Sequence, residues 1–186
     1  MHIRMLEGRN INMESKMIEL VQEVTKYGVY RREQLMDAAL GLCGETSEMV
    51  LEFIGTDKEK LITEMGDALW YLYSLADGFN LVQALPSVKD MRAVVEENDI
   101  MASYSTTELI VYTLTKVCDM ADYVKKFTVK GISIEASSLI KLLQFIYVAY
   151  VAIAQRAGID MEEAFNASFE KFKVRYPNGV AGGEVR

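Results

Sequence analysis

Apolar residues recur at intervals of three and four along most of this chain, which is the period of a helix with one buried face. The first such run covers residues 13–27, carries Met17, Leu20 and Val24 on one face, and stops at Gly28. The same period predicts further helices over residues 31–53, 58–80, 105–127, 134–158 and 160–174. Since no segment alternates strictly between apolar and polar residues, the pattern predicts an all-α protein.

Local signals set the expected helix boundaries. A Gly-Thr-Asp turn separates the second helix from the third, and Thr56 or Asp57 is placed to cap the third. Pro86 opens a more polar segment that extends to about residue 104 and has room for one short helix within VVEENDI. At the start of the last helix, Asp160 followed by Glu163 fits a capping box.

One helical hairpin is followed by a second that resembles it. The first covers about residues 31–81 and the second about residues 106–159, and the apolar positions of their second helices match. Two such hairpins can pack as a four-helix bundle. We therefore expect a single domain over residues 1–186, with a four-helix bundle core built from two hairpins and with additional flanking helices that include a C-terminal helix over 160–175.

Composition narrows the class of protein. Hydrophobic residues make up 51% of the 186 positions, as in a globular domain, and the formal net charge is −7. An acidic chain lacks the positive charge on which nucleic-acid binding relies, so we expect no nucleic-acid partner. Cys43 and Cys118 lie in apolar helical patterns and are predicted to be buried thiols of a reducing compartment rather than a disulfide.

The apolar run over residues 139–154 raises the question of a membrane span. It has 16 residues and contains Lys141 and Gln144, whereas a spanning helix needs about 20 apolar residues. The N-terminus lacks an apolar signal core. We expect a buried core helix, a soluble cytoplasmic protein and no membrane partner. Because residues 142–154 are more apolar than an isolated core requires, we also expect a homo-oligomer, with a dimer as the first choice.

Carboxylates stand in pairs on two consecutive predicted helices. Glu45 and Glu48 are three residues apart, and so are Glu64 and Asp67 on the next helix. Residues three apart share a helix face, so an antiparallel hairpin would bring the two pairs together. One such pair alone is typical of a solvated face, which is our interpretation of the nearby Glu52. For two pairs at mirrored distances from one short turn we favour a metal site.

Four converging carboxylates beside apolar residues need cations, because an unpaired buried charge is costly. Ligands made only of oxygen favour Mg²⁺, with Mn²⁺ as the alternative, over zinc. A di-iron site is disfavoured, since it needs Glu-x-x-His and the only histidine is His2. The second hairpin keeps acids at Asp119 and Asp122 but has Leu142 and Phe145 where the other two acids would stand. We therefore expect one metal site per chain.

Three stretches of the chain, GLCGETSE, EMGDALWYL and KFKVRYPNG, resemble the MazG-like family of all-α nucleoside triphosphate pyrophosphohydrolases. The wider superfamily includes the dimeric dUTPases and the phosphoribosyl-ATP pyrophosphatases. The resemblance covers residues 30–81 well and residues 160–179 in outline, whereas residues 82–135 have no detailed match. It implies Mg²⁺-dependent hydrolysis of the α–β phosphoanhydride of a (deoxy)nucleoside triphosphate, which yields the monophosphate and pyrophosphate and controls the nucleotide pool.

The resemblance also assigns residues. The family motifs E-x-x-E and E-x-x-D imply four Mg²⁺ ligands, Glu45, Glu48, Glu64 and Asp67. Family tails often read Asn-x-x-Lys-x-x-x-Arg-Tyr-Pro, which implies that Lys171 and Arg175 bind phosphate, while Ser168 replaces the asparagine. Simple MazG-like chains have one hairpin and dimerise, and dimeric dUTPases have two hairpins with one full metal set. This sequence combines the motif of the former with the layout of the latter.

Further site residues follow from position. Glu48, and nearly as well Glu45, is placed to orient the attacking water or to accept its proton. Trp70 shares the helix face of Asp67, so it either packs against the base or ribose or is an ordinary core tryptophan. Gln34 lies eleven residues before Glu45, about three helical turns, and either binds a base edge or is a surface glutamine.

Lys125 and Lys126 are further candidates for the phosphate site by position in the second hairpin, although solvated helix charges are the more ordinary interpretation. Two other functions remain open at this point. One is phosphoribosyl-ATP pyrophosphatase, which we rank lower because those chains usually contain a single hairpin. The other is a non-catalytic helical nucleotide-binding or interaction module, which the intact acids of the first hairpin disfavour.

Overall fold

The computed structural model describes residues 12–26, 31–97 and 103–176. Along the chain these form α1 (Met13–Lys26), α2 (Arg31–Gly55), α3 (Lys58–Gly78), the 3-10 turn η2 (Val82–Ala84), α4 (Val88–Glu97), α6 (Thr106–Thr128), α7 (Ala136–Ala157) and α8 (Met161–Arg175). None of the described residues lies in a strand, so the predicted all-α fold is confirmed.

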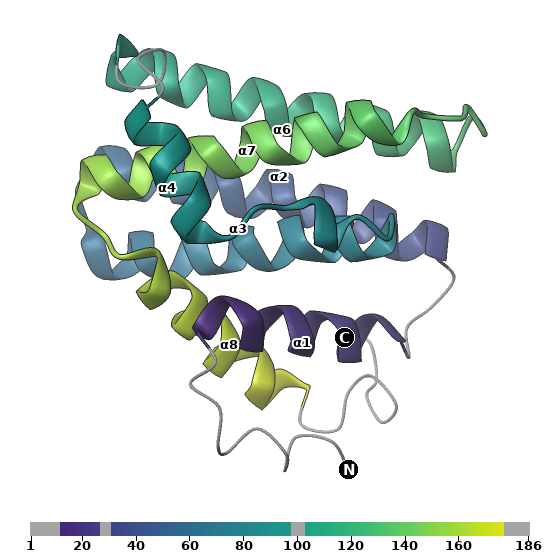
Figure 1. Ribbon diagram of the computed structural model, residues 1–186, viewed down its shortest axis with the longest axis horizontal. Coiled ribbons are helices and arrows are strands. Elements are labelled where there is room, and N and C mark those ends of the chain that lie inside the picture. The colour runs from purple at the N-terminus through teal and green to yellow at the C-terminus, as the bar shows by residue number, and fades with distance from the viewer. Residues whose placement is uncertain (1–11, 27–30, 98–102, 177–186) are drawn as a thin grey trace.

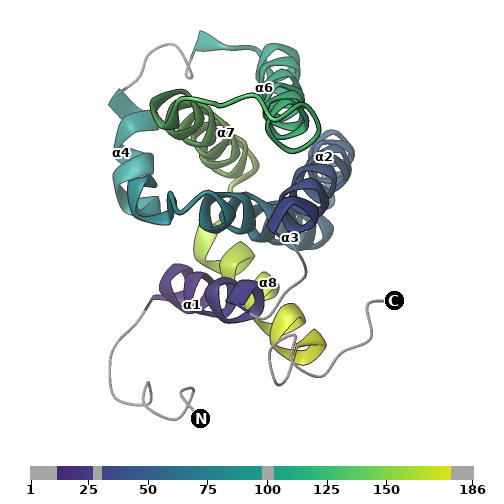
Figure 2. The same ribbon diagram turned by 90° about the vertical axis from the view of Figure 1, so that its right-hand side faces the viewer.

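The helices form three layers (Figure 1). The middle layer is the hairpin of α2 and α3. The hairpin of α6 and α7 lies on one side of it, where α6 packs against α2 and α7 against α3. On the other side of the middle layer, α1 and α8 pack against α3 and against each other. Helix α4 lies beside α7, at the edge of the second hairpin (Figure 2). Helix α3 therefore contacts every layer, and it carries two of the four predicted metal ligands.

The apolar faces predicted for the two hairpins are buried. Four apolar positions on the second helix of each hairpin, spaced by three and four, have low exposure: Leu61, Met65, Leu69, Leu72, Leu139, Leu143, Ile146 and Tyr150. Burial of a side chain of this size contributes about 1.5–3 kcal/mol relative to leaving it exposed. The agreement follows from the helical period itself, because residues spaced by three and four fall on one side of each helix.

The turn between α2 and α3 sets the register of the hairpin. Asp57 caps α3, because its side chain accepts a hydrogen bond from the Lys60 N–H at 3.2 Å. Thr56, the other predicted cap, instead adopts a left-handed conformation with φ of 64°. The chain can therefore reverse within two residues, which places the two acid-bearing helix faces side by side.

The middle of the chain differs from its prediction. The short helix expected within VVEENDI is α4, and it begins earlier, at Val88. Ser87 explains the earlier start: its hydroxyl accepts from the Asp90 N–H at 3.3 Å and donates to the Asp90 carboxylate at 2.7 Å. Residues 98–102, the end of the predicted element, lie outside the described part of the chain.

The start of α8 also differs in detail from its prediction. Asp160 is the N-cap, as expected, but its side chain accepts from the Glu162 N–H at 3.1 Å rather than from Glu163. The same oxygen of Asp160 also pairs with Arg92 of α4, which draws the carboxylate away from capping-box geometry.

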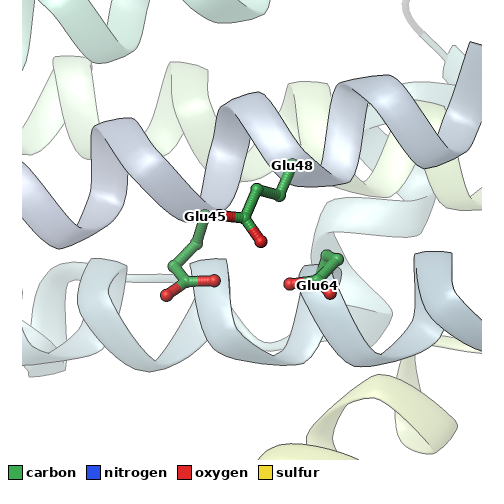
Figure 3. Close-up of side chains that lie close together, drawn as sticks. All are labelled: Glu45, Glu48 and Glu64. Carbon is green, nitrogen blue, oxygen red and sulfur yellow. The ribbon is translucent and has the colours of Figure 1, made fainter.

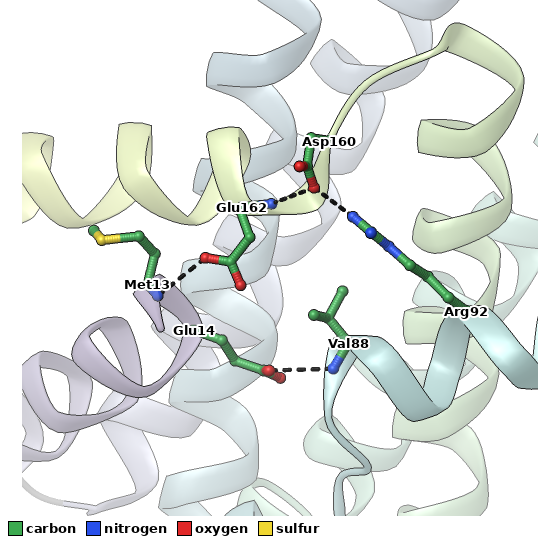
Figure 4. A network of polar contacts seen from close by, with 6 residues as sticks. All are labelled: Met13, Glu14, Val88, Arg92, Asp160 and Glu162. Atoms are coloured by element: carbon green, nitrogen blue, oxygen red, sulfur yellow. Dashed lines mark hydrogen bonds and ion pairs between the residues drawn. The ribbon is translucent and has the colours of Figure 1, made fainter. Parts of the chain in front are cut away.

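Carboxylates link the beginnings of three helices (Figure 4). Glu162 of α8 accepts from the Met13 N–H of α1 at 3.0 Å, and Glu14 of α1 accepts from the Val88 N–H of α4 at 3.1 Å. The starts of α1 and α4 thus each receive a negative charge from another helix, while α8 is capped by its own Asp160. These carboxylates satisfy unpaired N–H groups and complement the helix dipoles.

Glu14 of α1 also connects its own layer to the other two through hydrogen bonds. The residue is 4% exposed, and its carboxylate accepts hydrogen bonds from the hydroxyls of Tyr73 in α3, at 2.7 Å, and Tyr147 in α7, at 3.0 Å. Burial of this charge is tolerated because both oxygens have partners.

Helix α7 is longer than the apolar run suggested. It has 22 residues, because it extends beyond the 16-residue apolar run at both ends, and by length and composition alone it is apolar enough to cross a membrane. In the most apolar 18-residue stretch of this helix, 61% is buried inside the protein, as in a core helix. That burial also removes the reason for expecting self-association through residues 142–154, and the dimer stays a prediction.

The cysteines are less buried than predicted. Both thiols are free; Cys43 is half-buried and Cys118 is exposed. Cys118 lies on the outward face of α6, seven residues after the exposed Val111.

Candidate metal centre

A buried threonine fixes the rotation of α2 about its axis. Thr46 is fully buried, and its hydroxyl shares a hydrogen bond with the Tyr150 hydroxyl of α7. Because Thr46 points into the second hairpin, Glu45 and Glu48 on the adjoining face of α2 extend toward α3 (Figure 3). The second hairpin therefore orients the acids of the first.

Three of the four predicted ligands converge. Carboxylate oxygens of Glu45, Glu48 and Glu64 all lie within 4.8 Å of one another. Glu45 and Glu48 come from α2, and Glu64 faces them from α3 (Figure 3). Glu52 is not part of this group, and it is half-buried rather than fully solvated.

The fourth predicted ligand, Asp67, has a different environment. Its side chain is 2% exposed, and its Oδ2 atom forms an ion pair with Lys171 of α8. Its Oδ1 atom is buried and has no hydrogen-bond partner among the described residues. A buried carboxylate oxygen without a partner is costly, so Asp67 retains an unused ligand atom one helical turn beyond Glu64.

Gly66 permits the close approach of α8. A Cβ atom at this position would lie 2.5 Å from the carbonyl oxygen of Ala164 and 3.3 Å from the Cβ of Ser168. Its absence lets the two helices touch backbone to backbone and brings Ser168 and Lys171 to the acid site. The Ser168 hydroxyl is likewise buried without a hydrogen-bond partner in the described part of the chain.

Three of the four carboxyl groups have raised pKa values. Burial, followed by the charges of Asp67 and Glu48, raises the pKa of Glu45 from 4.5 to about 7, and Lys171 opposes this rise. Burial and Asp67 also raise the pKa of Glu64. Burial raises the pKa of Asp67 even though Lys171 favours its charged form. A divalent cation would favour the ionised form of all three carboxylates and so oppose these shifts.

The donor set fits a hard divalent cation. Mg²⁺ and Mn²⁺ prefer carboxylate oxygens, and the three glutamates offer such oxygens at mutual distances that one ion can bridge. The unpartnered oxygen of Asp67 is a second feature that a cation would satisfy. No described cysteine or histidine belongs to the cluster, which makes zinc a poor match.

The other predicted site residues do not belong to the glutamate cluster. Trp70 is 5% exposed and stacks on Phe172, with ring centroids 3.9 Å apart, so it occupies the core as the second of its two interpretations proposed. Gln34 is half-buried in α2, toward the start of that helix. Arg175 is exposed at the end of α8, where its charge favours the ionised form of Asp67 and so opposes the rise in the pKa of Asp67.

In the second hairpin the acids are neutralised by their own helix. Asp119 pairs with Lys116 at 3.2 Å, and Asp122 pairs with Lys125 at 2.8 Å and Lys126 at 2.6 Å. Lys125 and Lys126 are thus ordinary helix charges in this structure. At the two positions that have lost their acids, Leu142 is buried and Phe145 is 45% exposed.

Some residues that shape the site did not stand out in the sequence. Thr46 and Gly66 are adjacent to predicted ligands, but neither type signals a role unless the packing partner is known. The glycine within EMGD, in the middle of a strongly predicted helix, is the one signal that could have been used, because a helical glycine often marks a close approach.

Comparison of the chain with protein-family models, with curated proteins and with solved structures gives no match. The resemblance to the MazG-like family therefore rests on the sequence motifs alone.

Proposed function

We propose that this protein hydrolyses a (deoxy)nucleoside triphosphate to the monophosphate and pyrophosphate, with Mg²⁺ as cofactor. The observation that carries the proposal is the convergence of Glu45, Glu48 and Glu64 within 4.8 Å, next to a buried Asp67 with an unpartnered oxygen. The MazG-like motifs, which contain these four residues, support the same chemistry.

The division of roles follows from the surroundings of each acid. Glu45, Glu48, Glu64 and Asp67 would hold the cation, which polarises the α-phosphorus and stabilises charge on the leaving pyrophosphate when bound. Glu48 is exposed, whereas Glu45 is half-buried. Glu48 is therefore better placed to meet an incoming water and to accept its proton, and Glu45 to serve as a ligand.

Basic residues of α8 would complete the phosphate site. The Lys171 side chain is 47% exposed beside Asp67, and Arg175 is exposed one turn later. A triphosphate is strongly anionic, so it can approach the acid cluster only if cations and basic side chains offset the repulsion. Trp70 is covered by Phe172, which leaves the base-binding residues to other parts of the surface.

A panel assay tests the proposal. Pyrophosphate release would be measured for each dNTP and NTP, and for phosphoribosyl-ATP, with Mg²⁺ and with EDTA. The proposal predicts release from at least one nucleotide triphosphate that EDTA abolishes. Release from phosphoribosyl-ATP alone would identify the alternative enzyme. The absence of release from every compound would contradict both and favour the non-catalytic binding module.

A further inference from the structure

We propose that the Lys171 ammonium takes the place of a metal ion beside Asp67 in the metal-free protein. When a divalent cation binds, it displaces this ammonium, which then turns toward the triphosphate. The proposal rests on the metal site of the proposed function and adds a coupling between two ligands. The metal would release the very side chain that the nucleotide needs, so metal and nucleotide would favour each other's binding.

The first observation is the uneven distribution of positive charge at the site. Lys171 contacts Asp67, the most buried of the four acids, while no ion pair within the described residues joins a basic side chain to Glu45, Glu48 or Glu64. A direct ion pair is thus present at one predicted ligand, whereas the charge of Lys171 acts on Glu45 and Glu64 only from a longer distance.

The second observation is the state of Asp67 itself. One oxygen pairs with Lys171 and the other is buried without a hydrogen-bond partner among the described residues. A lysine ammonium satisfies only part of this carboxylate. Because a lysine carries one charge, a divalent ion shared with the three glutamates would satisfy the site better, and its charge would repel the ammonium.

The third observation is the freedom of the lysine side chain. Asp67 is 2% exposed, but the Lys171 side chain is 47% exposed, so its flexible four-carbon stem can turn the ammonium outward. Helix α8 need not move, because the Gly66 contact and the stacking of Trp70 on Phe172 hold it against α3. The exchange is therefore a side-chain motion on a rigid support.

These features predict opposite effects on the two ligands. In a Lys171→Met variant the metal no longer competes with an ammonium, so Mn²⁺ should bind about tenfold more tightly than to the wild type. A nonhydrolysable triphosphate should bind more weakly at saturating Mn²⁺, because the released lysine is missing. Lys173→Met is the matched control: it removes the same charge from α8, at an exposed position against the Phe169 ring.

The decisive experiment has two arms. Calorimetry would measure Mn²⁺ and triphosphate affinities for the wild type and both variants. Since Lys171→Met leaves a buried acid unpaired, the second arm uses the wild type alone: acylation of lysines is followed by mass spectrometry with and without Mg²⁺. We expect Mg²⁺ to increase the labelling rate of Lys171 several-fold, triphosphate to reverse this increase, and Lys173 to be unaffected.

The outcomes separate the inference from the function on which it rests. If Mn²⁺ binds the wild type but neither its affinity in Lys171→Met nor the labelling of Lys171 changes, the displacement is wrong and the metal site stands. Weaker Mn²⁺ binding in Lys171→Met would likewise show that the displacement is wrong, while the metal site stands. If the wild type binds no divalent cation, the proposed function and this inference are both overturned.

Discussion

Glu45 shows how its neighbours determine the chemistry of a single carboxylate. It is half-buried in α2, and burial with the nearby charges of Asp67 and Glu48 raises its pKa to about 7. An unfolded glutamate has a pKa of about 4.3. Without a cation, the folded protein therefore binds a proton at Glu45 in a range where the unfolded chain has lost it.

This difference predicts how stability depends on pH. Because the folded state binds more protons between about pH 4.5 and pH 7, the free energy of unfolding in EDTA should fall as the pH rises through that range. The raised pKa values of Glu64 and Asp67 act in the same direction. In Glu45→Gln the fall should be smaller. Urea unfolding at several pH values checks this, and equal slopes in the wild type and the variant would contradict it.

At the scale of elements, the contact between α3 and α8 positions Lys171 and supports Asp67. It depends on Gly66, where an added Cβ would meet the carbonyl oxygen of Ala164 at 2.5 Å. Gly44 of α2 is also helical, but an added Cβ there would meet no atom within 4 Å. The two glycines therefore form a natural pair for comparison.

Replacement of Gly66 by alanine should destabilise the protein by about 1–3 kcal/mol, because α8 must move or the backbone must distort. It should also lower any turnover, since Lys171 would lose its position beside Asp67. Gly44→Ala should be neutral or stabilise α2 by up to about 1 kcal/mol, since alanine favours a helix. Thermal unfolding of both variants tests this. Similar effects of the two substitutions would show that the α3–α8 contact is looser than described.

The elements also show which parts of the site could be predicted. The facing of Glu45 and Glu48 toward Glu64 follows from helical spacing and a short turn, both of which are local. The pairing of Asp67 with Lys171 joins residues 104 positions apart, and it exists only because α8 folds back over α3. No periodicity within either helix specifies that contact. Similarly, α4 begins at Val88, ahead of VVEENDI, because the Ser87 side chain bonds to Asp90.

At the scale of the whole molecule, the two hairpins pack together but differ in charge. The first has three glutamates without basic partners in the described residues, whereas the second pairs Asp119 and Asp122 with lysines of the same helix. The large exposed apolar side chains include Leu40, Leu51 and Ile54 of α2. An interface of a dimer would therefore use such exposed positions and not the buried part of α7.

The charge difference predicts one nucleotide site per chain. A nonhydrolysable triphosphate titrated in saturating Mg²⁺ should bind with a stoichiometry of one per chain by calorimetry. Light scattering on the same samples would measure the mass and so test the expected dimer, in which two nucleotides would bind. Two nucleotides per chain would contradict the assignment of the second hairpin as lacking a site, whereas a monomer would contradict only the dimer.

The central claim is that hydrolysis requires the carboxylate cluster and the cation it holds. The most direct test measures pyrophosphate release against Mg²⁺ concentration for the wild type, Glu48→Gln, Asp67→Asn and the control Glu59→Gln, which alters an exposed acid in the first turn of α3. Each substitution keeps the side-chain size and removes one charge.

The account predicts Mg²⁺-dependent release by the wild type and Glu59→Gln, with release abolished in Glu48→Gln and Asp67→Asn while circular dichroism shows unchanged helix content. Near wild-type release by either cluster variant at saturating Mg²⁺ would contradict it.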